Sequence, residues 1–373
     1  MKLPLADSPN LGITHPEPSE CLPLWASTAS EWKGGLTTEE YLEESMYLAS
    51  SPNSTHLHAD WILVDLNLPV DERQILSSCE TFYRRALVHR PGESVEEAVV
   101  YGIASVFTAP EYRRKGYAKR MLQEIAAIYV KPYCAATILF SDIGKKFYSE
   151  LGWHPLPGNS HLKFPALAGT KEATPLFESD LGDLCKDDEM MIRKAMSSRA
   201  PDRKTRMIMI PDHRQMLWHH VREEFVCKKL LEKSPKVKGA MAGKPGSRVW
   251  VIWTHKFNGK PEDLEAGSTL YILRLVIEKQ GPEGNVSAKD REDVKENLKI
   301  VIRSAQAEAV EWKLASVTMW GPTPLMKELV HEMGIQFSDM EREKEGIASL
   351  MLTEGGGEED GVEWLANERY SWL

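Results

Sequence analysis

The chain has 373 residues, more than one hydrophobic core usually organises, so its length predicts two domains. Hydrophobic residues make up 42% of the chain and charged residues 27%, a balance that excludes a wholly disordered or fibrous protein. The formal net charge of −9 argues against nucleic acid or anionic lipid as a partner, because both attract clustered Lys and Arg. An anionic ligand therefore requires a local basic pocket.

The N-terminal segment lacks the apolar run of a secretory signal peptide, because Pro4, Asp7 and Pro9 interrupt it. No stretch approaches the roughly 18 uncharged apolar residues of a membrane span. The five cysteines are an odd number without a C-x-x-C pair, which indicates free thiols in a reducing compartment. We therefore expect a cytoplasmic protein.

The first part of the chain alternates between helical and strand patterns. Apolar residues spaced on one face predict helices, and β-branched or aromatic runs bounded by turn residues predict strands. A basic turn that contains a glycine separates the third strand from the second helix. In chain order we expect a helix over 37–50, strands over 58–67, 78–90 and 99–108, a helix over 117–130, a strand over 134–140, a short helix over 145–155 ended by Gly152, and a strand near 161–164.

The stretch 165–183 contains prolines and glycines without hydrophobic periodicity, so we predict a connector there. This divides the chain into domains at 1–166 and 167–373. The second half repeats the strand, helix, strand order of the first. Its expected elements are helices over 187–198 and 211–232, an exposed lysine-rich loop over 233–248, strands over 248–255 and 269–278, a helix over 288–310, a strand over 314–320, a helix over 324–333, a strand over 347–353, and a solvated acidic glycine turn over 355–361 before an aromatic-rich end.

The basic turn over 113–120, RRKGYAKR, carries the strongest chemical signal in the sequence. Consecutive backbone amides at a helix N-terminus can converge on a phosphate, and the helix dipole favours the negative charge. A glycine removes the side chain that blocks the approach of such a ligand. The octapeptide alone predicts either a pyrophosphate site or a merely exposed basic turn.

The segment APEYRRKGYAKRML resembles the R-x-x-G-x-A pyrophosphate loop of the GCN5-related N-acetyltransferases (GNATs), with Arg113, Gly116 and Ala118 at the motif positions. FYSELGW, residues 147–153, is similar to a later motif of the same superfamily. The segment LFSDIGKKFYSELGWHP, with the long second domain and the aromatic end, further resembles the fungal lysine N6-acetyltransferases of lysine catabolism. The resemblance to the superfamily covers roughly residues 35–165.

This resemblance implies an α/β protein: a GNAT fold with a mixed, splayed central sheet, followed by a second, degenerate GNAT-like α/β domain. It implies acetyl-CoA as co-substrate and no metal. The second half lacks a phosphate turn of its own, so we expect one CoA per chain. The implied cofactor-binding residues are Val106, Phe107 and Thr108 at a strand end, against the pantetheine arm, and Arg113, Arg114, Lys115, Gly116, Tyr117, Ala118 and Lys119 around the pyrophosphate.

Acetyl transfer to a lysine amine needs a base, because the ammonium has a reference pKa near 10.4. Many members of the superfamily carry a Glu on the central strand, but residues 103–106 contain none. The candidate bases are the terminal carboxylate of Leu373, Glu80 and Asp142. Asp142 has a second interpretation as the cap of the helix that begins near Gly144.

Tyr148 in FYSELGW matches the tyrosine that, in this superfamily, often protonates the departing CoA thiolate. A phenol with a pKa near 10 is a sensible donor to a thiolate of somewhat lower basicity. The alternative interpretation is an aromatic core residue at helical spacing.

Two other groups of side chains carry less weight. Cys134 has no His near it in sequence, so a buried thiol is favoured over an acetyl-cysteine intermediate. His219, His220 and Glu223 lack the H-E-x-x-H pattern, and adjacent histidines point to different helix faces. No metal site is expected from them.

The sequence therefore predicts an acetyl-CoA-dependent N-acetyltransferase that acts on the ε-amine of free L-lysine by direct transfer in a ternary complex. One alternative is a protein-lysine or N-terminal acetyltransferase, for which an open groove is expected. The other is a non-catalytic CoA-binding interaction module. The oligomeric state is not predicted.

Overall fold

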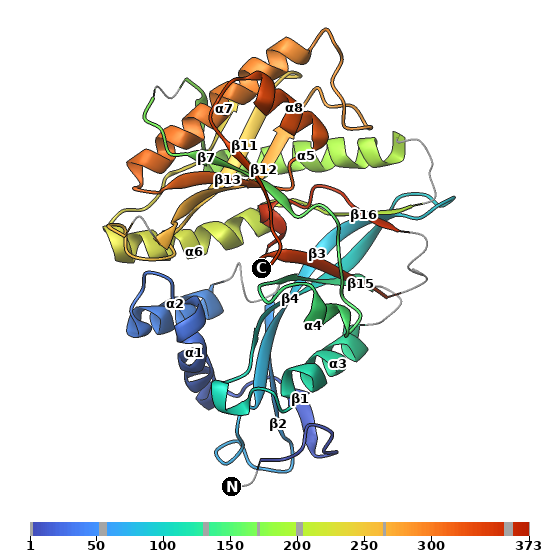
Figure 1. Cartoon of the computed structure of the whole chain (residues 1–373), viewed down its shortest axis with the longest axis vertical. Coiled ribbons are helices and arrows are strands. Elements are labelled where there is room, and N and C mark those ends of the chain that lie inside the picture. The colour runs from blue at the N-terminus through green and yellow to red at the C-terminus, as the bar shows by residue number, and fades with distance from the viewer. Residues whose placement is uncertain are drawn as a thin grey trace.

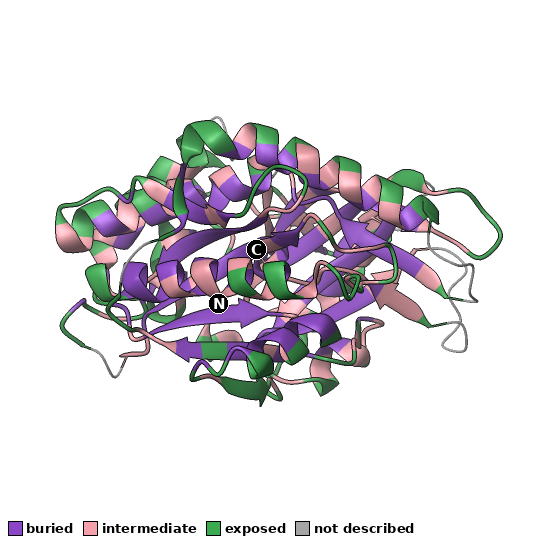
Figure 2. Cartoon of the chain, turned by 90° about the horizontal axis from the view of Figure 1, so that it is seen from above, coloured by how far each residue is buried: buried purple, intermediate pink, exposed green. Residues whose placement is uncertain are grey.

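The fold, seen in a computed structural model, consists of two mixed β-sheets that lie one above the other with helices around and between them (Figure 1). Strands are buried along most of their length, and helices bury one side and expose the other (Figure 2). The structure describes residues 3–51, 58–129, 134–169, 172–198, 204–263, 266–353 and 361–372.

The first sheet carries the strands predicted over 58–67, 78–90, 99–108 and 134–140. Its main order is β1 (Leu11–Thr14), β2 (His58–Asp65), β3 (Ser77–His89), β4 (Glu96–Phe107), β5 (Cys134–Ser141), β15 (Ile347–Leu352) and β6 (His154–Pro155), with β9 (Thr205–Met209) paired to β3 and β16 (Val362–Trp364) paired to β9.

β4 and β5 run parallel, and their pairing ends at Ile103 and Leu139 although both strands continue. A bulge in the β3–β4 ladder accompanies this, where Ser105 adopts a φ of 50°. The two strands therefore part at one end, as the predicted splayed sheet requires.

The helices of the first half include the two predicted over 37–50 and 117–130, together with one before residue 37 that was not predicted. They are α1 (Pro18–Trp32), α2 (Thr38–Ser50), α3 (Tyr117–Tyr129) and α4 (Lys146–Ser149), with a 3-10 turn, η1, at Pro110–Tyr112. Thr37 and Glu40 form a capping box at the start of α2. Met121, Leu122 and Ile125 of α3 are buried against the first sheet.

The second sheet and its helices form the other layer. The strand order is β14 (Ser338–Glu341), β7 (Ser160–Pro165), β13 (Ser316–Trp320), β12 (Thr269–Ile277), β11 (Val249–Lys256), β10 (Val237–Ala242) and β8 (Thr174–Phe177). The helices are α5 (Glu178–Ser198), α6 (His213–Leu231), α7 (Arg291–Glu311) and α8 (Pro324–Glu332), with a final 3-10 turn, η3, at Arg369–Ser371.

The two halves of the chain exchange strands. β7 precedes residue 166 but pairs with β13 of the second sheet. β15, close to the end of the chain, pairs with β5 of the first sheet, and β9 pairs with β3. The division at 166 falls between β7 and β8 and stays a prediction, but the halves are interlocked by these strands.

Three expectations about local structure, for two irregular segments and one helix, are wrong. The lysine-rich loop over 233–248 contains β10, because Lys238 is buried, 5% exposed, and pairs with Glu223. The connector over 165–183 contains β8 and the first turns of α5. The helix over 145–155 is only the single turn α4, although Gly152 does adopt the expected left-handed conformation, with a φ of 101°.

Other expectations are met or lie outside the described residues. All five cysteines are free. Within the described residues, none of the helices combines the length and the apolar character that crossing a membrane requires. The acidic glycine turn over 355–361 lies, except for Gly361, outside the residues that the structure describes.

Candidate active site

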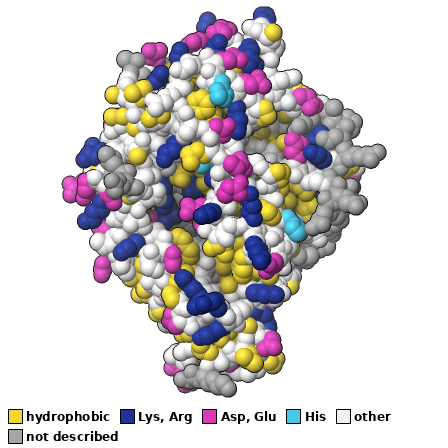
Figure 3. Space-filling view, viewed as in Figure 1, with side chains coloured by type: hydrophobic (Ala, Val, Ile, Leu, Met, Phe, Trp, Pro, Cys, Tyr) yellow, Lys and Arg dark blue, Asp and Glu magenta, His cyan; other side chains and the backbone are white. Residues whose placement is uncertain are grey.

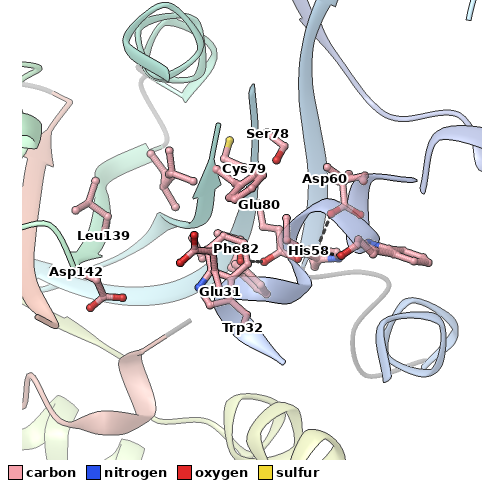
Figure 4. A pocket seen from close by; sticks show the side chains of 18 of the residues that line it. Glu31, Trp32, His58, Asp60, Ser78, Cys79, Glu80, Phe82, Leu139 and Asp142 are labelled. Carbon is pink, nitrogen blue, oxygen red and sulfur yellow. Dashed lines mark hydrogen bonds and ion pairs between the residues drawn. The ribbon is translucent and has the colours of Figure 1, made fainter. Parts of the chain in front are cut away.

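A cavity of about 610 Å³ opens where β4 and β5 part, and we call it the central cavity (Figure 4). Its walls come from α1, α2, β2, β3, β4, β5 and α4 of the first half. Trp218 and Arg222 of α6, and Trp372 near the chain end, close it from the second half. Both halves therefore contribute to one cavity.

The structure brings part of the predicted cofactor site to this cavity. Val106, Phe107, Thr108, Arg113 and Ala118 line it. The Ser77 hydroxyl donates to the carbonyl oxygen of Phe107 over 2.8 Å, and Arg113 Nε donates to that of Thr108 over 2.9 Å. Arg113 thus fixes the strand end that was predicted to meet the pantetheine arm.

The basic loop has the backbone form of an anion site. Arg114 and Gly116 have φ values of 62° and 89°, and Arg120 N donates to the carbonyl oxygen of Gly116 over 3.0 Å as α3 begins. The amides that precede this bond have no helical acceptor and are available to a ligand. Lys and Arg side chains gather on the lower part of the face shown in Figure 3.

The remaining residues of the loop do not line the central cavity. Arg114, Lys115 and Lys119 are exposed, whereas Tyr117 is buried and donates its hydroxyl to the carbonyl oxygen of Pro4 over 2.6 Å. The Tyr117 side chain therefore packs the loop against the N-terminal segment.

Glu80, a predicted candidate base, lies in the cavity within a charged cluster (Figure 4). His58 Nε2 lies 3.3 Å from Glu80 Oε1 and 3.5 Å from Asp60 Oδ1, and the Ser105 hydroxyl donates to the other oxygen of Glu80. Burial acts to lower the pKa of His58, but the two carboxylates outweigh it and raise that pKa to about 10. The pair at neutral pH is therefore an imidazolium and a carboxylate.

Burial also opposes the ionisation of Glu80, yet its contacts with His58 and Ser105 lower its pKa below the ordinary value. Sequence reasoning missed His58, Asp60 and Ser105. A signal was present, because Asp60 and Glu80 face each other across β2 and β3, and opposed like charges need a cation between them.

The same cluster bears on the expected absence of a metal. The ligand atoms of His58, Asp60 and Glu80 lie within 4.8 Å of one another, close enough to hold a metal ion. Since a ligating histidine must be neutral, the raised pKa of His58 makes metal binding compete with a proton. The expectation of no metal stays a prediction.

Tyr148 lines the central cavity and is 8% exposed. Burial raises the pKa of its hydroxyl, so the phenol is protonated at neutral pH. Its ring also packs in a core cluster with Leu139 and Trp153. Both interpretations of Tyr148, as a core aromatic residue and as a proton donor, are thus compatible with its position.

Asp142 lines the cavity, but its expected capping role is wrong. Its Oδ1 accepts a hydrogen bond from Gly346 N over 2.8 Å, and Lys145, without a side-chain cap, precedes α4. Asp142 therefore joins the end of β5 to the turn that precedes β15. The chain terminus at Leu373 lies outside the described residues, so its carboxylate stays a candidate, while Trp372 does line the cavity.

A second charged pair, also missed from the sequence, joins the two halves at the cavity wall. Arg222 Nε of α6 donates to Glu44 Oε1 of α2 over 3.1 Å. The side chain of Glu44 is 2% exposed and that of Arg222 is 22% exposed. Burial acts to lower the pKa of Arg222, but the Glu44 carboxylate raises it, so the guanidinium is charged.

The cysteine and histidine side chains for which the sequence disfavoured a catalytic or metal-binding role make hydrogen bonds within the fold. Cys134 is buried and donates its thiol to the carbonyl oxygen of Ala136. His219 and His220 each bond a main-chain carbonyl oxygen, whereas Glu223 pairs with Lys238. These side chains do not converge on a common point.

Comparison with known proteins agrees with this geometry. Residues 63–156 match the acetyltransferase (GNAT) domain, and residues 161–373, more than half of the chain, match the LYC1 GNAT-like C-terminal domain. The chain is 24% identical to the uncharacterized protein YGR111W of Saccharomyces cerevisiae, over 93% of this chain and 94% of that protein. It is 22% identical to a lysine acetyltransferase of Yarrowia lipolytica, over 92% of this chain and 94% of that protein.

A solved structure shares the fold over nearly the whole chain. It is a probable N-acyltransferase of Enterococcus faecalis, 14% identical, with a TM-score of 0.51 that covers 92% of this chain and 72% of that one. The matches to both halves, together with the splayed sheet, identify the chain as a member of the LYC1-like GNAT acetyltransferases.

Proposed function

We propose that this acetyltransferase moves the acetyl group of acetyl-CoA to the ε-amine of free L-lysine, by direct transfer in a ternary complex. The observation that carries the proposal is that Glu80, ionised beside His58, and the protonated Tyr148 both line the central cavity. The name of the Yarrowia lipolytica relative supports lysine as the amine.

Acetyl-CoA occupies the gap between β4 and β5. The main chain around Val106 and Thr108 meets the pantetheine arm, and the loop amides before Arg120 bind the pyrophosphate. The left-handed residues of this loop and the cations on its surface support this position. The acetyl thioester then points into the central cavity.

The amine must lose a proton before it attacks the thioester. For a lysine ammonium this costs roughly 4.6 kcal/mol at pH 7, from about 3.4 pK units at 1.36 kcal/mol each. Glu80 takes that proton as it leaves and, because its pKa is below the ordinary value, passes it on to solvent. The amine nitrogen then bonds to the thioester carbon. When the carbon–sulfur bond breaks, the nitrogen loses its second proton to water and Tyr148 donates its own proton to the thiolate, so that free CoA and the neutral amide leave. The base and the acid are then restored by exchange with solvent.

Free lysine carries two further charges that the cavity can match. Glu44 supplies a carboxylate for the α-ammonium, and Arg222, with only its Nε bonded to Glu44, presents its terminal nitrogens to the α-carboxylate. The rings of Trp218 and Trp372 close the cavity from the second half. A cavity walled by both halves of the chain and lined by a buried charge pair favours a free amino acid over a protein segment.

The test measures CoA release from acetyl-CoA with L-lysine, ornithine, cadaverine or a histone-tail peptide, together with the mass of each product. We expect L-lysine to be acetylated fastest, and cadaverine at least about tenfold more slowly because it lacks the α-carboxylate. Acetylation of the peptide alone would overturn the free amino acid as substrate. If no amine accelerated CoA release while CoA still bound, the protein would be a binding module.

A further inference from the structure

A second cavity of about 560 Å³ lies outside the active site, and we call it the α6 cavity. It is bounded by β3, by α5 and by the first residues of α6. The rings of Phe82 and Trp218, in edge contact at 5.5 Å, belong to the wall of the central cavity and not to this one. The guanidinium of Arg84, two residues along β3, lies 5.2 Å from the Phe82 ring on the side of the α6 cavity.

Several buried polar atoms of the residues that line this cavity have no partner among the described residues, although Arg84 Nη1 donates to the carbonyl oxygen of Tyr83 over 3.1 Å. Arg84 and Gln215 are each 2% exposed. Arg84 Nε, both polar atoms of the Gln215 carboxamide and Nε2 of His213 accept or donate no hydrogen bond there. An unsatisfied buried polar group costs roughly 1–3 kcal/mol, so four such atoms on one cavity indicate that they serve a ligand.

The charge of this group points to an anion. Burial lowers the pKa of Arg84 to about 10, and the Asp212 charge only partly opposes this. The Asp212 side chain is engaged as the N-cap of α6, where it accepts from Gln215 N over 3.1 Å. Arg85, also in the wall, is held by Glu97 and Glu189. Among the described residues that line this cavity, the Arg84 guanidinium is therefore a buried cation without an ion pair to a carboxylate.

We propose that the α6 cavity binds a small organic carboxylate, held by Arg84 and by the carboxamide of Gln215. A carboxylate matches the flat array of donors on a guanidinium, and the Gln215 nitrogen supplies a further donor. The carboxylates of Asp212 and Glu189 border the same cavity and disfavour a dianion such as phosphate. This site does not depend on the acetyl-transfer reaction proposed above.

The test measures binding of propionate by ligand-observed NMR, with the full chain saturated with CoA. We expect propionate to bind the unaltered protein, and Arg84→Met or Gln215→Leu to weaken binding at least about tenfold. Arg90→Met is the matched control, because Arg90 lies just beyond β3 and pairs with Glu96 away from this cavity. Inorganic phosphate is a second probe.

Thermal unfolding without propionate separates a binding role from a structural one. Because Arg84 and Gln215 leave atoms unsatisfied, Arg84→Met and Gln215→Leu should preserve or raise the midpoint, whereas a structural role predicts a lower one. The proposal is overturned if propionate does not bind, if both variants bind it as the unaltered protein does, or if phosphate binds and propionate does not.

Discussion

Each sheet contains a parallel pair of strands joined through a helix, β4 and β5 through α3 and β12 and β13 through α7. In the first sheet the strands part and leave the central cavity. In the second sheet β12 runs on beyond its last pair with β13, but the end of the chain fills the corresponding place. Leu275 N donates to Glu368 over 2.8 Å, and Arg274 is held by Asp188 and Glu368.

The helix that follows the first strand differs in the same way. The turn before α3 is basic and contains a left-handed glycine, whereas the first turn of α7 carries Glu292 and Asp293. Acidic side chains near the amides of a helix N-terminus compete with a phosphate for the positive end of the dipole. We therefore expect a ligand site only in the first sheet, where the strands part and the turn before the helix is basic.

The largest expected change in activity, and the sharpest test of the difference between the two sheets, comes from replacing Glu80. We expect Glu80→Gln, which keeps the size but removes the carboxylate, to lower kcat about 10³-fold, within the range for a positioned base. Steady-state kinetics with L-lysine measure it, and unchanged CoA affinity shows that the cofactor site is intact. If kcat stayed within threefold of that of the unaltered enzyme, Glu80 would not be the base, and the terminal carboxylate of Leu373 or a water molecule would take that role.

The phosphate turn comes next. A Glu side chain at Gly116 needs a φ near 89°, comes within 3.1 Å of Ala6 and adds a charge of the same sign as the pyrophosphate. We expect CoA affinity to fall about 200-fold in Gly116→Glu, roughly 3 kcal/mol, as measured by calorimetry on a protein whose circular dichroism is unchanged. Lys289→Glu, before α7, is the control and should bind CoA normally. Equal affinities for the two variants would show that α3 does not hold the pyrophosphate.

Replacing Tyr148 tests whether this residue is the proton donor in the central cavity between β4 and β5. Tyr148→Phe keeps the ring in its core cluster, so we expect little change in thermal stability and a fall in kcat of about 10². Tyr148→Phe should recover part of the lost kcat with an acetyl thioester of a more acidic thiol, because that leaving group needs less protonation. An unchanged kcat would assign Tyr148 to packing alone.

Local patterns predicted most of the regular elements, because periodicity and caps act within a few residues. The pattern failed for α1, which contains Pro23 and several Ser and Thr residues of low helix preference. It also failed for β10, where Lys238 is buried against Glu223 of the preceding helix α6. The strand exchange of β7 and β15 depends on contacts between the halves and leaves no local signal.

The candidate site divides in the same manner. The loop around Gly116 and the position of Tyr148 could be predicted from the sequence, because each lies within a short continuous motif. The cluster of His58, Glu80 and Ser105 depends on strand register and on a bulge, and the pair of Glu44 and Arg222 depends on how two helices from different halves meet. Such contacts exist only after the chain has folded.

The smallest expected effect is a dependence of stability on pH that His58 confers. Its pKa is about 10 in the folded chain and near 6.5 when unfolded, so its stabilising contribution is complete below about pH 6.5 and is lost as pH rises towards 10. His58→Gln removes this contribution. We expect the difference in unfolding midpoint between the unaltered protein and His58→Gln to shrink by about 3 °C between pH 6.5 and 10, as measured by calorimetry. The buried His255 beside Glu223 titrates in both proteins and cancels in the comparison. A difference that stays constant or grows with pH would show that His58 is neutral in the fold, so that Glu80 would lack its cation and the contrast between the two gaps would lose its electrostatic basis.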